Sequence, residues 1–256
     1  MQAERIVTSR LTTRGYELCS GGTIPPSTFL RYLEHTRWNV LLSASPLSLH
    51  RHFRIGVVRA ERLELLHQVS FHVDLEFSVW VSRVGRTSID LAHEVRRAQD
   101  DVLVARAGAT IVSLDQDRRP TPISEEARAL VTERPLPQVE PLGETAPDGA
   151  WSTPILIRPS DQDLQQHVNH ARYADFVDDV RQLCAREQGY GPGPWSSPVG
   201  RLLIEFEQEA RVGQALAGRT WKLGGAAHAV GVELYTEGGA VVTRARLDLQ
   251  VQSPAK

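Results

Sequence analysis

The sequence predicts an α+β protein built from two similar modules. Three observations support this: each half contains one helix-like segment, alternating strand-like segments follow each helix, and a proline-rich stretch separates the halves. A strand, a long helix and a series of antiparallel strands, present twice, are typical of a duplicated α+β domain. The chain has 256 residues, of which 41% are hydrophobic, enough for two modules that each bury a core.

The two predicted helices carry apolar residues at helical spacing and both open with Arg-Tyr. They are RYLEHTRWNVLL (residues 31–42) and RYADFVDDVRQLC (residues 172–184). Apolar side chains that recur every three or four residues fall on one helix face. A short strand-like run precedes each helix: RIVTSRL (residues 5–11) in one half and TPILIRP (residues 153–159) in the other.

Alternating apolar and polar residues after each helix predict antiparallel strands with one buried face. The first half contains QVSFHVDLEFSVWVSRVG, TSIDLAHEVRRA and VLVARAGATIVSL, and the second contains RLLIEFEQEARVG, AVGVELYTEG and AVVTRARLDLQVQ. Residues 132–149, TERPLPQVEPLGETAPDG, hold four prolines and no periodicity, which indicates an extended linker. We therefore expect an N-terminal module of residues 1–140 and a C-terminal module of residues 141–256.

Composition argues against several classes of protein. The formal net charge of -2 gives no broad attraction to nucleic acid or to an anionic membrane. No apolar run is long enough to cross a membrane, and the first ten residues lack the apolar core of a signal peptide. Cys19 and Cys184 are too few for a disulfide framework and are expected to be reduced thiols. These features predict a cytoplasmic protein.

The start of the second helix is unusually rich in groups that can do chemistry. The stretch SDQDLQQHVNHARYADFVDDVRQ begins at Ser160 and places carboxylates, amides and imidazoles immediately before an amphipathic helix. One aspartate there would be expected only to cap the helix. The combined pattern favours an active site, formed by Asp161, Asp163, Gln165, His167, Asn169 and His170.

This stretch resembles the motif at the start of the long helix in hotdog thioesterases, where an S/T-D-x-D segment is followed by His-Val-Asn. The duplicated layout and the downstream LLIEFEQEARVG are most similar to the tandem acyl-acyl-carrier-protein thioesterases of bacteria and plants. The resemblance covers nearly the whole chain in layout, but its motifs are strong only in the second half. It implies two fused hotdog modules, each an antiparallel sheet wrapped around a long central helix, which together form an internal pseudo-dimer.

The resemblance also implies site residues. The motif aspartate falls on Asp163 and the motif histidine on His167, with Gln165 at a position between them that is often Asn in the family. The glutamate implicated in activating water matches Glu209. The next residue is Ala210, where some plant members carry a cysteine, so a cysteine nucleophile is not expected at this position.

Hydrolysis of a thioester requires stabilisation of an oxyanion. The N-terminus of a helix offers backbone N–H groups and about half a positive charge. We therefore expect the N–H groups around Val168, Asn169 and His170 to receive the carbonyl oxygen, as in an oxyanion hole. The side chains of Asn169 and His170 are expected to have structural hydrogen-bonding roles.

The reaction also needs an activated water. Asp163 could orient this water, act as general base or attack as a nucleophile, and the sequence leaves these roles open. Glu209, expected on a strand, could share the activation. His167 could hold a carboxylate or donate toward the oxyanion, and Gln165 could position the water through its amide.

The first half lacks these groups. Its corresponding segment, CSGGTIPPSTFLRYLEH, has no aspartate or histidine before the helix, only Ser27 and Thr28 as expected caps. Asp74 is the expected counterpart of Glu209, with a structural role favoured. One active site per chain follows, with the N-terminal module supplying an acyl-chain pocket. Phe29, Leu33 and Trp38 are candidates to line that pocket, although all three are as well explained as core residues.

Alternative chemistries fit less well. Hotdog hydratases have an Asp-x-Asn-Pro-x-His pattern, whereas His167 lies four residues after Asp163 with no proline between them. A metal site formed by Asp163, His167 and His170 has only the spacing in its favour. No serine-hydrolase elbow or nucleotide-binding glycine motif is present. No cofactor is therefore expected.

The expected function is hydrolysis of an acyl thioester, with fatty acyl-acyl-carrier-protein favoured as substrate. An acyl-CoA thioesterase remains open, as does a hotdog protein that binds an acyl thioester without hydrolysing it. The expected partner is therefore an acyl carrier protein or a coenzyme A thioester. The oligomeric state stays open, because the internal pair already supplies what single hotdog modules obtain by dimerising.

Overall fold

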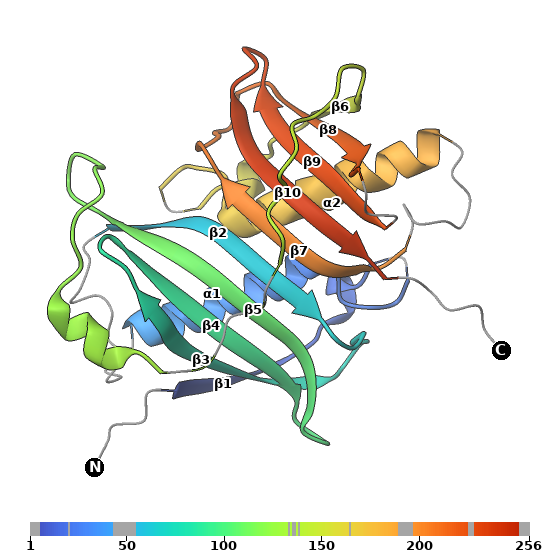
Figure 1. The fold of residues 1–256 in the computed structure, drawn as a ribbon. Coiled ribbons are helices and arrows are strands. Elements are labelled where there is room, and N and C mark those ends of the chain that lie inside the picture. The colour runs from blue at the N-terminus through green and yellow to red at the C-terminus, as the bar shows by residue number, and fades with distance from the viewer. Residues whose placement is uncertain are drawn as a thin grey trace. The chain divides into compact units, whose positions relative to one another are not determined.

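The structure is a computed structural model that describes residues 6–19, 21–42, 55–132, 134, 137, 139–163, 165–188, 197–224 and 228–250. It divides into two compact units, Met1–Gln138 and Val139–Lys256. Each unit consists of one long helix and an antiparallel sheet (Figure 1). The expected α+β class is confirmed.

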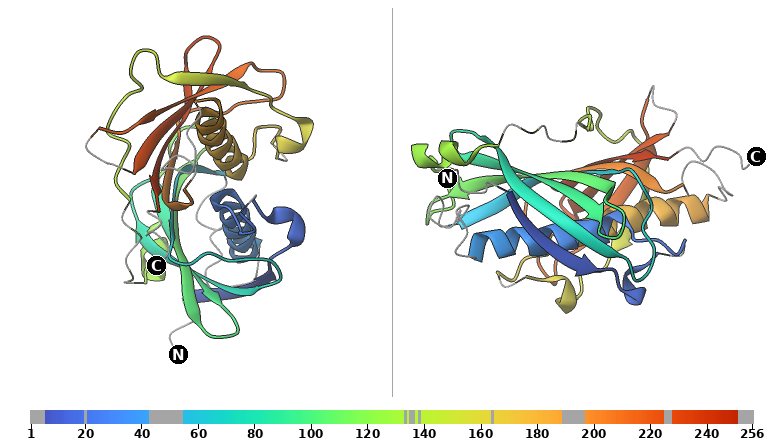
Figure 2. Two further views of the ribbon diagram at one scale, coloured as in Figure 1. Left: turned by 90° about the vertical axis from the view of Figure 1, so that its right-hand side faces the viewer. Right: turned by 90° about the horizontal axis from the view of Figure 1, so that it is seen from below.

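The N-terminal unit forms its sheet in the order β1-β3-β4-β5-β2, with every neighbouring pair antiparallel. The helix α1 lies against one face of this sheet (Figure 2). The ring of Tyr32 there meets Phe77 edge to face. The elements are β1 (Ile6–Thr12), the short 3-10 helix η1 (Gly15–Glu17), α1 (Pro26–Leu42), β2 (Ile55–Leu65), β3 (Asp74–Val84), β4 (Ser88–Arg97), β5 (Val102–Leu114) and the 3-10 helix η3 (Glu125–Leu130).

The C-terminal unit repeats this plan, with sheet order β7-β10-β9-β8-β6. Its helix α2 approaches β8 so closely that a Cβ atom at Gly218 would lie 2.3 Å from the side chain of Val180. Only glycine therefore fits at this crossing. The elements are β6 (Trp151–Ile155), the 3-10 helix η4 (Pro159–Asp161), α2 (His170–Glu187), β7 (Val199–Phe206), β8 (Leu216–Lys222), β9 (Ala229–Thr236) and β10 (Val241–Leu249).

Each unit has four strands after its helix, and sequence analysis named only three. The missed strands are β2, IGVVRAERLEL, and β8, LAGRTWK. Both carry charged residues among the apolar ones, and β8 contains Gly218, so neither has a clear alternating pattern. Because β2 was missed, β3 was matched with β7, whose counterpart in the sheet order is β2.

In each unit the buried side chains of the sheet lie mainly on the face that packs against the helix. In the N-terminal unit the residues on that face of β3, β4, β5 and β2 are almost completely buried, whereas the opposite face carries mainly charged and polar side chains. This alternation is the expected signature of a sheet with one packed face. Among the described residues, no helix is long and apolar enough to span a membrane.

Candidate active site

The loop that leads into α2 is fixed by a buried ion pair. Asp161 is only 1% exposed, and its carboxylate accepts hydrogen bonds from the backbone N–H of Arg158 at 2.8 Å and from the guanidinium of Arg172 at 2.7 and 2.9 Å. Arg172 also pairs with Asp175 on the same helix. Asp161 is therefore a structural anchor between η4 and α2, and it does not cap the helix.

Asp163 lies at the centre of a tight turn. Its Oδ1 accepts from the backbone N–H groups of Gln165 at 2.8 Å and His167 at 3.3 Å, and its own N–H donates to the carbonyl of His167 at 2.9 Å. Gln166 completes the turn with a left-handed φ of 63°. Oδ2 of Asp163 has no hydrogen-bond partner in the described part of the chain, so it is available to a substrate or water.

Gln165 takes part in this turn through its backbone alone. Gln165 is exposed, and its side chain forms no hydrogen bond with the described residues. The prediction that its amide positions the catalytic water stays a prediction.

The helix α2 begins at His170 and is capped by Asn169. The Asn169 side chain accepts from the N–H of Ala171 at 2.9 Å, which is the structural role expected for this residue. Two of the three expected oxyanion donors are already engaged, however. The N–H of Val168 donates to Ala210 at 2.8 Å, and the N–H of Asn169 donates to Asp161 at 2.8 Å. Both amides are engaged in backbone hydrogen bonds and cannot receive a carbonyl oxygen in this arrangement.

His167 and Glu209 are brought together by the fold. The Nε2 atom of His167 lies 3.0 Å from a carboxylate oxygen of Glu209 and 2.8 Å from Nη2 of Arg211. His167 is almost fully buried, whereas the Glu209 side chain is 37% exposed. Glu209 was expected on a strand. In the structure β7 ends at Phe206, and Glu209 lies in the irregular segment that follows.

The three-way contact has a chemical consequence. A single ring nitrogen either carries a proton and donates to Glu209, or lacks one and accepts from Arg211. The imidazole of His167 can therefore exchange partners as its proton moves. This arrangement brings a solvent-accessible carboxylate, a buried imidazole and a cation into contact. Sequence analysis gave no role to Arg211.

Tyr173 is a second residue that sequence analysis considered only for packing. Its side chain is 3% exposed, and its hydroxyl oxygen accepts from the N–H of Ala210 at 3.0 Å. Burial, together with the charges of Glu209 and Asp163, raises the pKa of the Tyr173 phenol to about 12, against the lowering effect of the Ala210 N–H. The negative charges of both carboxylates therefore act on this hydroxyl.

The N-terminal unit has the same loop with other side chains. The N–H of Cys19 donates to Thr23 at 2.9 Å, as that of Asp163 does to His167, and Gly22 has a left-handed φ of 72° where the C-terminal loop has Gln166. A weak contact of 3.6 Å joins the side chains of Cys19 and Thr23. Cys19 and Thr23 thus occupy the positions of Asp163 and His167.

The segment that carries Glu209 also has its counterpart. The N–H of Ile24 donates to the carbonyl of Val69 at 2.8 Å, in the same way that Val168 donates to Ala210. The residue before Val69 is Gln68, so Gln68 corresponds to Glu209. The expected counterpart, Asp74, is wrong: it begins β3 and accepts a hydrogen bond of 2.5 Å from Thr12.

Further expectations for the first helix need correction. Ser27 and Thr28 are not caps, because α1 already begins at Pro26 and includes both. The two Arg-Tyr pairs are not equivalent either. Counted from the start of each helix, Phe29 occupies the position of Tyr173, and Tyr32 the position of Phe176.

The three candidate pocket residues of the first module differ in exposure. Phe29 and Leu33 are 0% and 1% exposed and belong to the core of the N-terminal unit. Trp38 is 50% exposed and lies on the solvent side of α1. Core packing explains the first two, and the assignment of any of them to an acyl pocket stays a prediction.

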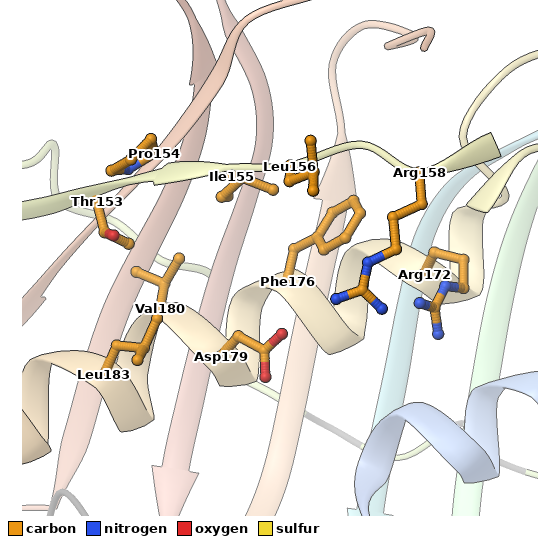
Figure 3. A pocket seen from close by; sticks show the side chains of 10 residues that line it. All are labelled: Thr153, Pro154, Ile155, Leu156, Arg158, Arg172, Phe176, Asp179, Val180 and Leu183. Carbon is orange, nitrogen blue, oxygen red and sulfur yellow. The ribbon is translucent and has the colours of Figure 1, made fainter. Parts of the chain in front are cut away.

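A small cavity in the C-terminal unit does not coincide with the site. It has a volume of about 140 Å³ and lies between β6 and α2, with an apolar lining that includes Phe176 and Val180 and two guanidinium groups at one end, Arg158 and Arg172 (Figure 3). Asp179 lines it as well, and partial burial and the neighbouring acidic residues raise the pKa of this carboxyl. None of the predicted catalytic side chains lines this cavity. Across the described ranges, no cluster of His, Cys, Asp and Glu that could hold a metal ion is formed.

Comparison with known proteins gives a partial family match and several solved structures of similar fold. Residues 22–131 match the model of the thioesterase-like superfamily. Among solved structures, the 12:0-ACP thioesterase from Umbellularia californica is similar with a TM-score of 0.79 at 18% identity, over 96% of this chain and 94% of the other. The chain has a double-hotdog fold, and its N-terminal unit is similar to the thioesterase-like model. A search of curated protein sequences gives no significant match.

Two more solved structures show that this fold occurs in proteins with different names. An acyl-ACP thioesterase from Bacteroides thetaiotaomicron has a TM-score of 0.77 at 16% identity, over 96% of this double-hotdog protein and 98% of the other chain. Full-length peroxisomal multifunctional enzyme type 2 from Drosophila melanogaster has a TM-score of 0.64 at 14% identity, over 96% of this chain and 48% of the other. Structures named as thioesterases and a structure named as a multifunctional enzyme therefore share this fold. The fold does not determine the reaction, which must be argued from the site. The family match lies in the N-terminal unit, whereas the motif that carried the resemblance lies in the C-terminal unit.

Proposed function

We propose that this double-hotdog protein hydrolyses an acyl thioester at the start of α2, in its C-terminal unit. The observation that carries the proposal is the 3.0 Å contact between His167 and Glu209, beside a turn built on Asp163. It combines a solvent-accessible carboxylate, a buried imidazole and a second carboxylate with an unused oxygen. These are the groups that activation of a water molecule requires. The thioesterase-like match of residues 22–131 supports the same reaction class.

In the proposed mechanism Glu209 acts as the general base. Its carboxylate removes a proton from a water molecule, whose oxygen then bonds to the carbonyl carbon of the thioester. The tetrahedral intermediate collapses with cleavage of the carbon–sulfur bond, and the departing thiolate takes up the proton from Glu209. The products are a free acid and a thiol, and no cofactor takes part.

The surrounding residues have supporting roles in this proposal. Oδ2 of Asp163 accepts a hydrogen bond from the attacking water and so orients it. His167 holds the carboxylate of Glu209 in place. Because the amides of Val168 and Asn169 are engaged, positive charge for the developing oxyanion comes from Arg211 and from the dipole of α2.

We further propose an acyl-acyl-carrier-protein as the substrate. The support is that two solved structures similar over nearly their whole length bear the names of acyl-ACP thioesterases. An acyl-CoA substrate is the alternative within the same reaction, and binding without hydrolysis is the alternative to it. A carrier protein is a large acidic partner, so hydrolysis of its thioesters should weaken with added salt more than hydrolysis of acyl-CoA does.

The test is release of free thiol from matched acyl-carrier and acyl-CoA thioesters of several chain lengths, followed with a thiol reagent. Wild-type turnover that is lost in Glu209→Gln would support both the reaction and the site. A folded wild-type protein that releases no thiol from any substrate would overturn hydrolysis. If such a protein still bound the thioesters, the non-hydrolytic alternative would replace it.

A further inference from the structure

The cavity between β6 and α2 is a candidate ligand site that the proposed mechanism does not use (Figure 3). One wall comes from residues 153–158, which form the end of β6 and the segment after it. The other wall is one face of α2, formed by Arg172, Phe176, Asp179, Val180 and Leu183. None of the proposed catalytic side chains lines the cavity, so a ligand bound there would leave the catalytic groups free.

Much of the lining is apolar. Val180 and Ile155 meet over β8, because a Cβ atom at Gly218 would lie 2.3 Å from Val180 and 3.1 Å from Ile155. Leu156 and Leu183 also line the cavity but are 75% and 40% exposed, so two large apolar side chains remain in contact with water. An apolar cavity with exposed apolar residues around it is typical of a site for an apolar group.

One end of the cavity carries a cation without a partner. Figure 3 shows the guanidinium groups of Arg158 and Arg172 at this end. Arg172 is held by Asp161 and Asp175. Within the described ranges the guanidinium of Arg158 forms no hydrogen bond or ion pair, and only its backbone N–H is engaged. All five guanidinium N–H donors of Arg158 are therefore available to a ligand.

The arginine at the corresponding position of the N-terminal unit is engaged. The backbone N–H of Arg14 donates to Glu17, just as that of Arg158 donates to Asp161. The guanidinium of Arg14 donates to the hydroxyl of Tyr16 at 3.1 Å and lies 3.5 Å from the carboxylate of Glu17. The C-terminal loop keeps the backbone contact alone. The side chain of Arg158 is therefore not required to hold its own loop.

Asp179 is the third charged group of the lining and restricts the ligand further. Partial burial, and then the charges of Asp175 and Asp178, raise the pKa of Asp179 against the lowering effect of Arg172 and Arg158. The carboxyl of Asp179 therefore takes up a proton more readily than usual, whereas the guanidinium of Arg158 cannot lose its charge. Charge complementarity at this end of the cavity favours an anion over a cation.

The cavity volume limits the apolar part of the ligand. A dry apolar cavity of about 150 Å³ holds one benzene molecule. The volume here is about 140 Å³, so it accommodates about six carbon atoms. The anionic group must match the planar fork of an arginine, and a carboxylate does so with two parallel hydrogen bonds.

We propose that the cavity between β6 and α2 binds a carboxylate whose apolar body has about six carbon atoms. Arg158 holds the carboxylate, and the carbon chain lies against Phe176, Val180 and Ile155. The ligand class is a short-chain carboxylic acid. Binding at this cavity goes beyond the proposed hydrolysis and does not depend on it.

The experiment locates the ligand as well as measuring its affinity. Butanoate, hexanoate, octanoate and decanoate are titrated at constant ionic strength into methyl-labelled wild-type protein, and NMR follows the methyl groups of Ile155, Val180 and Leu183. We expect saturable shifts of these methyl groups. Affinity should rise about fourfold for each added carbon up to octanoate and then level off, because further carbons no longer fit the cavity. Hexanoate should bind about fivefold more tightly than hexan-1-ol, and hexylamine should bind worst.

Three variants test the charged groups. Arg158→Gln should lose the preference for hexanoate over hexan-1-ol. Asp179→Asn removes the opposing charge and should bind hexanoate more tightly than the wild-type protein does. Arg14→Gln is the matched control in the N-terminal unit and should leave hexanoate binding unchanged. The methyl spectrum of each free variant shows whether it is folded.

Each remaining outcome overturns the proposal. It fails if no carboxylate shifts the methyl groups of Ile155, Val180 and Leu183, or if the shifts occur only at other methyl groups. It also fails if hexan-1-ol binds as tightly as hexanoate, if folded Arg158→Gln keeps the preference, or if hexylamine binds most tightly, which would make Asp179 the recognition group. The wild-type titrations decide even where a variant does not fold. Thiol release is measured separately, so hydrolysis and carboxylate binding can fail independently.

Discussion

The loops that precede the two long helices have one backbone framework and two sets of side chains. In both, an arginine N–H donates to an acidic residue at the end of a short 3-10 helix, Glu17 in the N-terminal unit and Asp161 in the C-terminal unit. In both, a left-handed residue closes the turn and an amide donates to the segment after the next strand. Duplication has preserved the hydrogen bonds that hold the loop, while the groups that can do chemistry occur in one copy.

The acidic residues of the two loops also have different partners. Glu17 accepts a hydrogen bond from the hydroxyl of Tyr32, in the second turn of α1. Asp161 pairs instead with Arg172, and the position of Tyr32 is held by Phe176. The tyrosine of the C-terminal unit lies one turn earlier, at Tyr173, where its hydroxyl contacts the segment that carries Glu209. The tyrosine hydroxyl thus contacts the loop anchor Glu17 in the N-terminal unit. In the C-terminal unit, one helical turn earlier, it contacts the candidate site.

The largest expected effect is at the proposed base. Glu209→Gln removes the ionisable group but keeps its size, and we expect kcat for thioester hydrolysis to fall about 1,000-fold, since general bases contribute about 10²–10⁴. The matched control is Gln68→Ala, at the corresponding position of the N-terminal unit, which should change kcat less than twofold. Thiol release under saturating substrate measures both. Equal losses in the two variants would contradict the assignment of the site to one unit.

The second effect concerns the turn residue. Asp163→Asn keeps an oxygen for the N–H groups of Gln165 and His167 but removes the negative charge that orients the water, so kcat should fall about 100-fold. The melting temperature should stay nearly constant. Cys19→Ala is the control in the other unit and should leave kcat unchanged. Full activity in Asp163→Asn would reduce Asp163 to a structural turn residue.

These positions also show what sequence alone could predict. Asp163, His167 and Asn169 were found because their loop is local and the helix after it has a clear period. Arg211 and Tyr173 were missed as site residues, because their roles depend on contacts between α2 and the segment after β7 that no local pattern encodes. The match of Asp74 to Glu209 was wrong for a related reason: β2 alternates poorly, and once it was missed β3 took its place as the counterpart of β7.

A smaller effect is expected at the hydrogen bond between the Tyr173 hydroxyl and the N–H of Ala210. Tyr173→Phe gives the C-terminal unit the residue type that Phe29 has in the other unit and leaves the buried N–H of Ala210 unpaired. Stability should fall by about 1–3 kcal/mol, and kcat should fall about tenfold as Glu209 loses its fixed position. Tyr32→Phe, which breaks the contact with Glu17, should lose stability without loss of kcat. Denaturant melts and turnover together distinguish the two tyrosines, and a Tyr173→Phe protein with wild-type kcat would remove Tyr173 from the site.

The smallest effect separates the interiors of the two units. The inner face of β9 in the C-terminal unit carries Val230, Val232 and Leu234, whereas β4 carries His93, whose pKa is lowered by burial and by Arg37. A base with a depressed folded-state pKa contributes stability that is complete above its unfolded pKa of about 6.5 and is lost as pH falls toward the folded-state pKa. Between pH 7 and 5.5 the wild-type protein should therefore lose about 1 kcal/mol more unfolding free energy than His93→Leu, measured by urea unfolding at each pH. The two proteins differ only at residue 93, so the difference between their pH profiles isolates His93. Parallel pH profiles would show that this imidazole is already charged or solvated inside the folded N-terminal unit.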